Sequence, residues 1–176
     1  MSFEDIQHIC TTISKKNFIV IPANHNSPNQ IVISGNKSAV KETMEHARNS
    51  GARLVKELNV SGAFHSPLMK SAKFALSEAL DNTKINNANI PVYSNVSAKA
   101  TTESDEIRLN LKNQIDSPVL WCKTISNMKN DKASRMIEVG PGKVLQGLTR
   151  KIDKDLLSTG IENLEQINEF DYDRSI

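Results

Sequence analysis

The stretch that decides the fold is Val60-Ser61-Gly62-Ala63-Phe64-His65-Ser66-Pro67-Leu68-Met69, where a predicted strand gives way to a helix. The strand covers residues 53–60. The helix begins at Ser66, whose hydroxyl can cap it, and Pro67, which fits a first turn that needs no N–H donor. His65 stands at this junction, and a histidine held between two rigid elements suits a general base. Residue types alone favour the alternative, a histidine that only fills a loop.

Upstream of this junction the pattern predicts the order α-β-β-α-β. The first helix starts with Ser2 and Asp5, close to a capping box, and the first two strands read as an antiparallel pair. The expected helices cover residues 3–14 and 37–50, and the expected strands cover residues 18–22, 30–34 and 53–60. This order is a ferredoxin-like split βαβ unit without its first, central strand. A sheet without its central strand exposes two rows of unpaired backbone groups, so we expect the chain to continue a longer architecture.

Beyond His65, helices and strands alternate, which is typical of a parallel sheet covered on both faces. Helices are expected at residues 67–81, 105–115, 118–128, 143–152 and 163–170, and strands at residues 90–96, 135–139 and 156–161. The last residues, 171–176, are polar and are expected to fray. The fold class predicted for the whole chain is therefore α/β.

Composition argues against several classes of function. The chain has 22 basic and 20 acidic residues, a balance that gives no argument for nucleic acid as a partner, and only 5% aromatic residues to stack on bases. No apolar run approaches the roughly 18 residues of a membrane span, and Met1 opens no signal peptide. Cys10 and Cys122 lie far apart without metal-ligand spacing, which indicates a reduced, cytoplasmic location and no metal site.

Two further stretches could carry chemistry. Gly140-Pro141-Gly142-Lys143 follows a predicted strand, as a phosphate loop does, but it lacks Walker spacing and the Ser or Thr after lysine, so a tight turn is favoured. The loop at residues 24–30 carries amides that could bind a ligand carbonyl, although Asn and Ser are also ordinary turn residues. The chain has no Gly-x-Ser-x-Gly elbow, so His65 has no evident nucleophile of its own.

Four stretches together resemble the malonyl-CoA:acyl-carrier-protein transacylases, which load malonyl groups for fatty acid synthesis. They are PANHNSPNQIVISG at residues 22–35, GAFHSPLM at 62–69, PVYSNV at 91–96 and EVGPGKVL at 138–145. They occur in the family's order and at its spacing, and they cover almost the whole chain but only the C-terminal part of the family enzyme. The resemblance implies that residues 1–62 are an incomplete ferredoxin-like subdomain. Residues 63–176 are then the C-terminal part of a hydrolase-like parallel α/β subdomain.

The family works by a Ser–His pair. A serine takes the malonyl group from CoA as an ester and passes it to the phosphopantetheine thiol of acyl carrier protein, while the histidine accepts and returns the proton. The resemblance implies that His65 is this histidine, which reverses the preference for a loop filler. It implies that the backbone carbonyl of Gln114 holds the imidazole tautomer, and that Phe64 crowds out a methylmalonyl chain. Three asparagines in the matching stretches are further candidates for substrate binding: Asn24, Asn26 and Asn95.

The family's serine elbow, glutamine-containing oxyanion loop and carboxylate-binding arginine all lie upstream of the matching part. We therefore expect an [acyl-carrier-protein] S-malonyltransferase whose C-terminal portion, residues 1–176, is inactive alone. The expected partners are malonyl-CoA, acyl carrier protein and a second chain with the N-terminal half. No cofactor, nucleic acid or membrane is expected. The alternative is a non-catalytic remnant or an acyl-carrier-protein-binding module. An upstream reading frame that encodes a Gly-His-Ser-type elbow would favour the enzyme.

Overall fold

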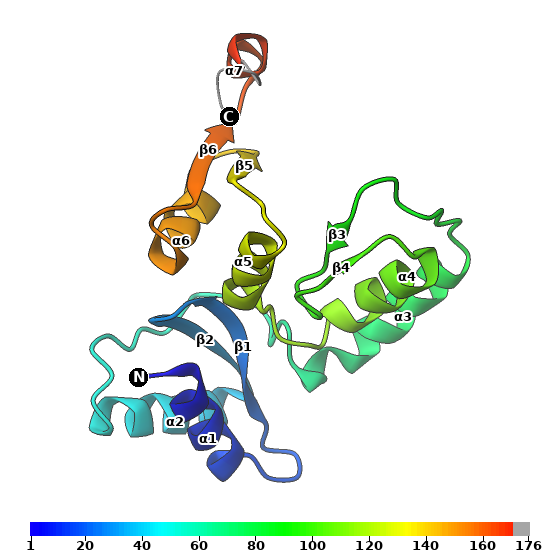
Figure 1. Cartoon of the computed structure of the whole chain (residues 1–176). Coiled ribbons are helices and arrows are strands. Elements are labelled where there is room, and N and C mark those ends of the chain that lie inside the picture. Colours follow the sequence, from blue (N-terminus) through cyan, green and yellow to red (C-terminus); the bar gives the residue numbers. More distant parts are fainter. Residues whose placement is uncertain (171–176) are drawn as a thin grey trace. The chain divides into compact units, whose positions relative to one another are not determined.

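The structure is a computed structural model that describes residues 1–170, and its elements are labelled in Figure 1. It divides into two compact units, Met1–Thr124 and a second unit that begins at Ile125. The boundary expected after residue 62 falls inside the first unit, so that division into subdomains stays a prediction. Residues 171–176, which the sequence predicts to fray, lie outside the described residues.

The first helix, α1 (Phe3–Ile13), starts with the capping box that its sequence predicts. The Asp5 N–H donates to Ser2 Oγ at 3.1 Å, and the Ser2 N–H donates to Asp5 Oδ2 at 2.9 Å. Two N–H groups at the helix start are thereby satisfied, and a cap of this kind stabilises a helix by about 1 kcal/mol.

The two strands that follow form an antiparallel hairpin, as predicted, but the first strand is longer than expected. Strand β1 (Val20–Ser27) pairs with β2 (Gln30–Gly35), from Val20 beside Gly35 to Ser27 beside Gln30, and only Pro28 and Asn29 form the turn. The prediction of a loop from residue 24 was therefore wrong. Pairing on both edges of β1 overrides the turn preference of its asparagines, because the His25 N–H also donates to the Val119 carbonyl at 2.9 Å.

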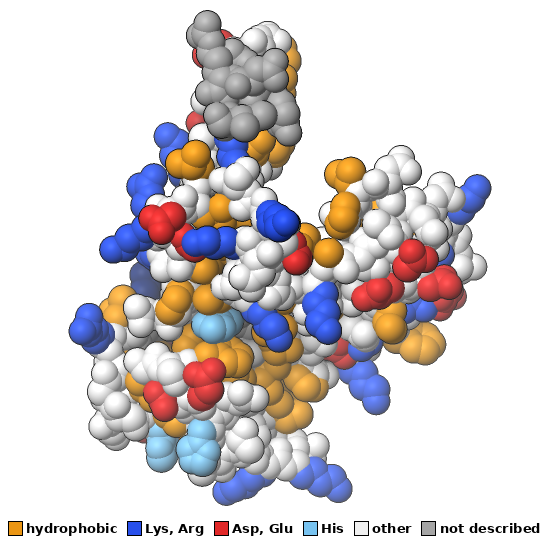
Figure 2. All heavy atoms as spheres, viewed as in Figure 1, with side chains coloured by type: hydrophobic (Ala, Val, Ile, Leu, Met, Phe, Trp, Pro, Cys, Tyr) orange, Lys and Arg blue, Asp and Glu red, His pale blue; other side chains and the backbone are white. Residues whose placement is uncertain are grey.

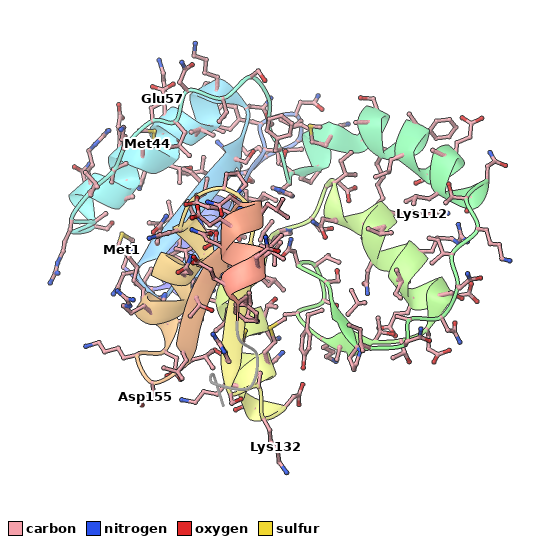
Figure 3. The ribbon with its side chains drawn as sticks, turned by 90° about the horizontal axis from the view of Figure 1, so that it is seen from above. Met1, Met44, Glu57, Lys112, Lys132 and Asp155 are labelled. Atoms are coloured by element: carbon pink, nitrogen blue, oxygen red, sulfur yellow. The ribbon has the colours of Figure 1, made fainter. Side chains whose placement is uncertain are left out.

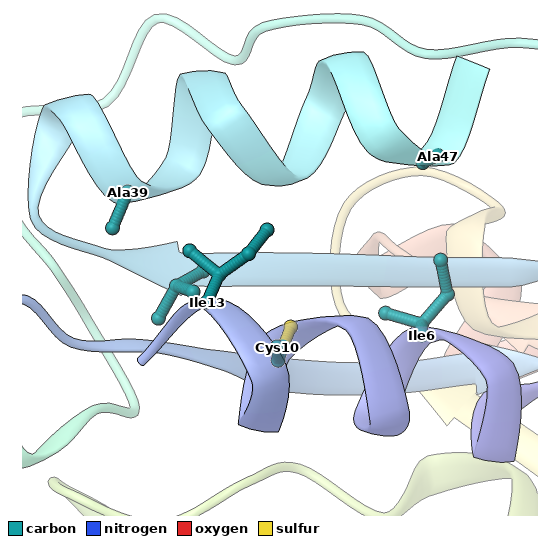
Figure 4. Packing of buried hydrophobic residues seen from close by; sticks show 6 residues of the cluster. Ile6, Cys10, Ile13, Ala39 and Ala47 are labelled. Atoms are coloured by element: carbon teal, nitrogen blue, oxygen red, sulfur yellow. The ribbon is translucent and has the colours of Figure 1, made fainter. Parts of the chain in front are cut away.

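The core of the first unit lies between this hairpin and two helices, α1 and α2 (Lys37–Asn49). Figure 4 shows side chains of its buried cluster, which consists of Ile6, Cys10, Ile13, Val20, Ala39 and Ala47. Gly35 is required at the end of β2, because a Cβ there would lie 2.0 Å from the Ile19 carbonyl oxygen. The same carbonyl accepts the N–H of Asn36 at 2.8 Å, so the chain closes tightly before α2.

The strand predicted at residues 53–60 is absent. This segment has no regular secondary structure, and three of its apolar side chains, Leu54, Leu58 and Val60, are exposed, with Leu54 at 84%, while Val55 is half-buried against the core. A strand exists only where a neighbouring strand accepts and donates its backbone hydrogen bonds. Within residues 1–170 the sheet at this place consists of β1 and β2 alone, so the segment has no such neighbour.

After His65, a 3₁₀ turn η1 (Pro67–Met69) leads into α3 (Lys70–Asp81), and α3 packs beside α4 (Ser104–Gln114). The strand predicted at residues 90–96 shrinks to β3 (Val92–Tyr93), which pairs antiparallel with β4 (Ala100–Thr101). The expectation of a parallel strand there was wrong. The described neighbour of β3 is β4, which returns antiparallel after the short connection at residues 94–99, whereas a parallel neighbour needs a long crossover connection.

Helix α5 (Trp121–Asn130) crosses the division between the units. In the second unit, β5 (Arg135–Val139) and β6 (Leu157–Ile161) form the predicted parallel pair, joined by α6 (Val144–Ile152) and followed by α7 (Leu164–Glu169). The chain therefore has a mixed α/β fold, while its ferredoxin-like and hydrolase-like parts stay predictions. No helix within residues 1–170 has the length and apolar character needed to cross a membrane.

Candidate active site around His65

The turn that carries His65 is held by a buried serine. Ser66 Oγ donates to the Ala63 carbonyl at 2.6 Å and accepts the Leu68 N–H at 3.4 Å, and the Ser66 residue has no solvent exposure. Ser66 thus caps η1, with Pro67 in its first turn, as the sequence predicts. The backbone on either side of His65 is fixed by this local network.

His65 itself has a left-handed backbone conformation, with φ at 57°. For a residue with a Cβ, such a conformation costs on the order of 1–3 kcal/mol and persists only where the surroundings impose it. The ring supplies one such restraint, because His65 Nδ1 lies 3.0 Å from the carbonyl oxygen of Gln114, the last residue of α4. The strained turn therefore aims the imidazole at a fixed acceptor.

This contact assigns the proton on the ring. A carbonyl oxygen only accepts hydrogen bonds, so His65 Nδ1 must carry the hydrogen that makes the bond to Gln114. In the neutral imidazole, Nε2 then has a free lone pair that can accept a proton from a nucleophile. The contact that the resemblance implied for Gln114 is present, and the catalytic roles of both residues stay predictions.

A lysine that the sequence did not single out holds the end of α4. Lys73 Nζ, on α3, donates to Asn113 Oδ1 at 3.0 Å and to Asp116 Oδ1 at 2.9 Å. Its two acceptors stand on either side of Gln114 in the chain. No local pattern could have predicted this cluster, because 40 and 43 residues separate the lysine from its partners.

His65 and Phe64 line a groove of ≈ 940 Å³ in the first unit. Asn24 and Asn26, both on β1, also line it, so the structure brings four of the predicted site residues to one cavity. Phe64 is 48% exposed, which leaves its ring free to contact a ligand beside His65.

Two predicted features stand apart from this groove. Asn95 is half-buried and does not line it; its backbone carbonyl accepts the Leu120 N–H at 2.8 Å. After the Gly140–Lys143 turn, the N–H groups of Leu145 and Gln146 donate to the carboxylate of Glu138. A phosphate bound at this turn would need the same N–H donors. Residues 1–170 also contain no group of three His, Cys, Asp or Glu side chains arranged to hold a metal ion.

A family model described as "Acyl transferase domain" matches residues 6–165 of the chain. The chain belongs to the acyl transferase family. The malonyl CoA-acyl carrier protein transacylase of Staphylococcus aureus (strain MSSA476) is 37% identical over 167 residues, which are 95% of this chain and 54% of the relative. The resemblance to the transacylases is thereby confirmed, and this acyl transferase chain spans about half the length of the curated relatives it matches.

Solved structures agree with this assignment. An acyl carrier protein S-malonyltransferase from Vibrio cholerae matches with a TM-score of 0.91 and 34% identity, over 96% of this chain and 55% of that one. A malonyl-transacylase in complex with a type II PKS acyl-carrier protein matches with a TM-score of 0.90 and 32% identity, over 96% of this chain and 54% of that one. The mixed α/β fold of this acyl transferase chain is therefore part of a malonyltransferase fold.

Proposed function

We propose that residues 1–176 provide the general base for malonyl transfer from CoA to acyl carrier protein in fatty acid biosynthesis. The single observation that carries the proposal is the bond between His65 Nδ1 and the Gln114 carbonyl. It holds the imidazole in the tautomer that leaves Nε2 available as a base, and His65 lines a groove large enough for a substrate.

The reaction runs in two balanced transfers. In the first, a serine oxygen attacks the malonyl thioester, His65 Nε2 takes the serine proton, and the departing CoA thiolate receives that proton as the C–S bond breaks. In the second, the phosphopantetheine thiol attacks the seryl ester, His65 takes the thiol proton, and the serine oxygen receives it. The serine, the oxyanion donors and the cation for the malonyl carboxylate belong to the part of the family's length that this chain does not match.

In this proposal, Phe64 and the two asparagines that line the groove contact the substrate. The exposed Phe64 ring neighbours His65, so it can occupy the space that a methyl branch on the malonyl group would need. The amides of Asn24 and Asn26 can donate to a carbonyl of the acyl chain or the pantetheine arm. Asn95 stays a weaker candidate, because it stands away from the groove.

Acyl carrier protein is the proposed acceptor, and the match to a malonyl-transacylase solved in complex with a type II PKS acyl-carrier protein supports this partner. A cytoplasmic location belongs to the same proposal. Residues 1–176 alone are expected to transfer no malonyl group, because removing the nucleophile from such a site costs roughly 10⁶-fold in rate.

A chimera tests the proposal. Residues 1–176 replace the matching half of the Staphylococcus aureus transacylase, and transfer of radiolabelled malonyl groups from malonyl-CoA to acyl carrier protein is measured. The chimera is expected to be active, the chain alone inactive, and the His65→Ala chimera reduced to background. A folded but inactive chimera, or an active His65→Ala chimera, would refute the proposal. Binding of acyl carrier protein without transfer would favour the alternative, a non-catalytic binding module.

A further inference from the structure

We propose that the connection between α4 and α5, residues 115–120, is a positioning element of the transfer reaction, and that the ion pair of Lys73 with Asp116 locks it (Figure 1). The connection holds the base His65 and the groove residue Asn24 in a fixed relation to each other. This role presupposes the proposed function, because both concern the same site.

The first end of the connection holds the base. The carbonyl oxygen of Gln114, the last residue of α4, lies 3.0 Å from His65 Nδ1 and accepts its hydrogen. The backbone of His65 has a strained, left-handed φ of 57°, a conformation that persists only where the surroundings impose it. A shift of the Gln114 carbonyl would therefore turn the imidazole away from its present direction.

The ammonium group of Lys73 locks this end on both sides of Gln114. Lys73 Nζ donates to Asn113 Oδ1 at 3.0 Å on one side, and to Asp116 Oδ1 at 2.9 Å on the other. Lys73 lies on α3, which begins directly after the turn η1 that follows His65. The lysine therefore fixes the end of α4 relative to the same stretch of chain that carries the imidazole.

The second end of the connection binds β1 on both sides of Asn24. The Val119 N–H donates to the Ala23 carbonyl at 2.8 Å, and the His25 N–H donates to the Val119 carbonyl at 2.9 Å. These two bonds make a parallel bridge between Asn24 and Val119. Asn24 lines the same groove as His65, and its amide is a proposed substrate contact. The second end thereby fixes the part of β1 that presents this contact.

The connection between the two ends is short and stiff. Five residues lead from Gln114 to Val119, and they reach at most about 18 Å when fully extended. Pro118 has a fixed φ and restricts the residue before it to extended conformations. The Leu120 N–H donates to the Asn95 carbonyl at 2.8 Å, directly before α5 begins. A displacement at the Gln114 end is therefore passed on to Val119 rather than absorbed within the connection.

Kinetics of the chimera with the Staphylococcus aureus part test the positioning role. Asp116→Ala should lower kcat about tenfold and leave KM for malonyl-CoA within about twofold, because a slightly misplaced base loses rate rather than substrate affinity. The double variant Lys73→Glu with Asp116→Lys rebuilds the ion pair with its charges exchanged and should recover most of the rate. Asp81→Ala breaks another ion pair between α3 and α4 and should leave kcat unchanged, which makes it the matched control.

Amide exchange at Val119 in the same chimera tests the lock without measuring activity. In Asp116→Ala, the Val119 amide should exchange at least about fivefold faster, because the loosened end frees its bond to Ala23. Amides of α1 should keep their rates, which shows that the chimera stays folded. The charge-exchanged variant should restore the protection of Val119, and Asp81→Ala should not alter it.

The outcomes separate this role from the proposed function. Unchanged exchange at Val119 in Asp116→Ala overturns the lock, and so does a loss in Asp81→Ala as large as that in Asp116→Ala. A charge-exchanged variant no better than Asp116→Ala also overturns it. An inactive parent chimera refutes the proposed function, whereas an active chimera whose kcat survives Asp116→Ala refutes the positioning role alone.

Discussion

Lys73 Nζ lies 2.9 Å from Asp116 Oδ1, an ion pair that ties α3 to the end of α4. The same nitrogen donates to Asn113 Oδ1, so its acceptors flank Gln114, whose carbonyl binds His65. The paired side chains are 29% and 19% exposed, in the range where an ion pair stabilises by about 1 kcal/mol or less. We therefore expect this ion pair to fix the position of the Gln114 carbonyl rather than to add much to the free energy of unfolding of the chain.

Lys73→Met is expected to loosen the Gln114 carbonyl and raise the share of His65 rings protonated at Nε2 instead of Nδ1. The ¹⁵N shifts of the His65 ring nitrogens report this tautomer ratio directly. Lys112→Met is the matched control, because Lys112, which Figure 3 labels, also joins α4 to α3, but its acceptor Asp81 does not flank Gln114 in the chain. Lys73→Arg should restore the ratio. A tautomer shift as large in the Lys112 variant would contradict the prediction.

Gln114→Ala is expected to change transfer by the chimera little, within about fivefold, which corresponds to about 1 kcal/mol. The bond to His65 uses the backbone carbonyl, and alanine supplies the same carbonyl at the end of α4. His65→Ala, in contrast, removes the base itself. The steady-state rates of the two variants decide the matter, and a larger loss at Gln114 than at His65 would mean that both roles are misassigned.

Glu138 is expected to make the start of α6 sensitive to acid. The Leu145 N–H donates to the Glu138 carboxylate, and so does the Gln146 N–H. These bonds, with that of Leu145 as the largest cause, hold the pKa of Glu138 below its usual 4.5. Because the pKa is lower in the folded chain, this stabilisation is present above pH 4.5 and is lost as the pH falls through the folded pKa. Amide exchange at Leu145 and Gln146 should accelerate over that range, after correction for intrinsic rates.

The matched variant for this prediction is Glu138→Gln, which keeps one acceptor oxygen but cannot titrate. Its exchange at Leu145 and Gln146 should show no acid transition in the same range. Glu45→Gln, on α2, is the control and should retain the transition at Glu138. A transition that survives in Glu138→Gln would assign the acid sensitivity to another group.

Cys10 is expected to resist alkylation while the core is intact. Burial raises the pKa of the Cys10 thiol to about 12, so only about 10⁻⁴ of it is thiolate at pH 8. Cys122 is half-buried, and burial also raises the pKa of its thiol, but its sulfur is more accessible. Mass spectrometry after iodoacetamide treatment should find label at Cys122 first and at Cys10 only after denaturation. Early labelling of Cys10 would show that the cluster around it opens readily.

Local sequence patterns predicted the helix starts, because the residues that form each cap lie within one helical turn of each other. Ser2 with Asp5, and Ser66 with Pro67, mark helix starts because each cap bonds groups two or three residues away. The contact of His65 with Gln114 came from family resemblance, since 49 residues separate them. Sequence periodicity failed where pairing decides the structure. Asn24 joins a strand because Val119 bonds beside it, and residues 53–60 are no strand because no described strand lies beside them.

Residues 1–176 alone are expected to be aggregation-prone or to lack a sharp unfolding transition. The parallel pair of β5 and β6 leaves Val139 78% and Leu157 63% exposed, and Figure 2 shows hydrophobic side chains on the surface of the view it draws. Each such side chain forgoes roughly 1.5–3 kcal/mol of burial, and a whole domain is stable by only about 5–15 kcal/mol. A few uncovered side chains therefore suffice to make folding marginal.

Near-UV circular dichroism during thermal unfolding measures this directly. The chain alone should show a broad transition or none, and the chimera should show a sharp one, because the added half covers the open edges of both sheets. Val139→Lys should improve the solubility of the chain alone, since it removes an exposed apolar group, yet it should destabilise the chimera. A sharp cooperative transition of monomeric residues 1–176 would show that the uncovered surfaces cost less than the burial values imply, and that the chain is a self-sufficient domain.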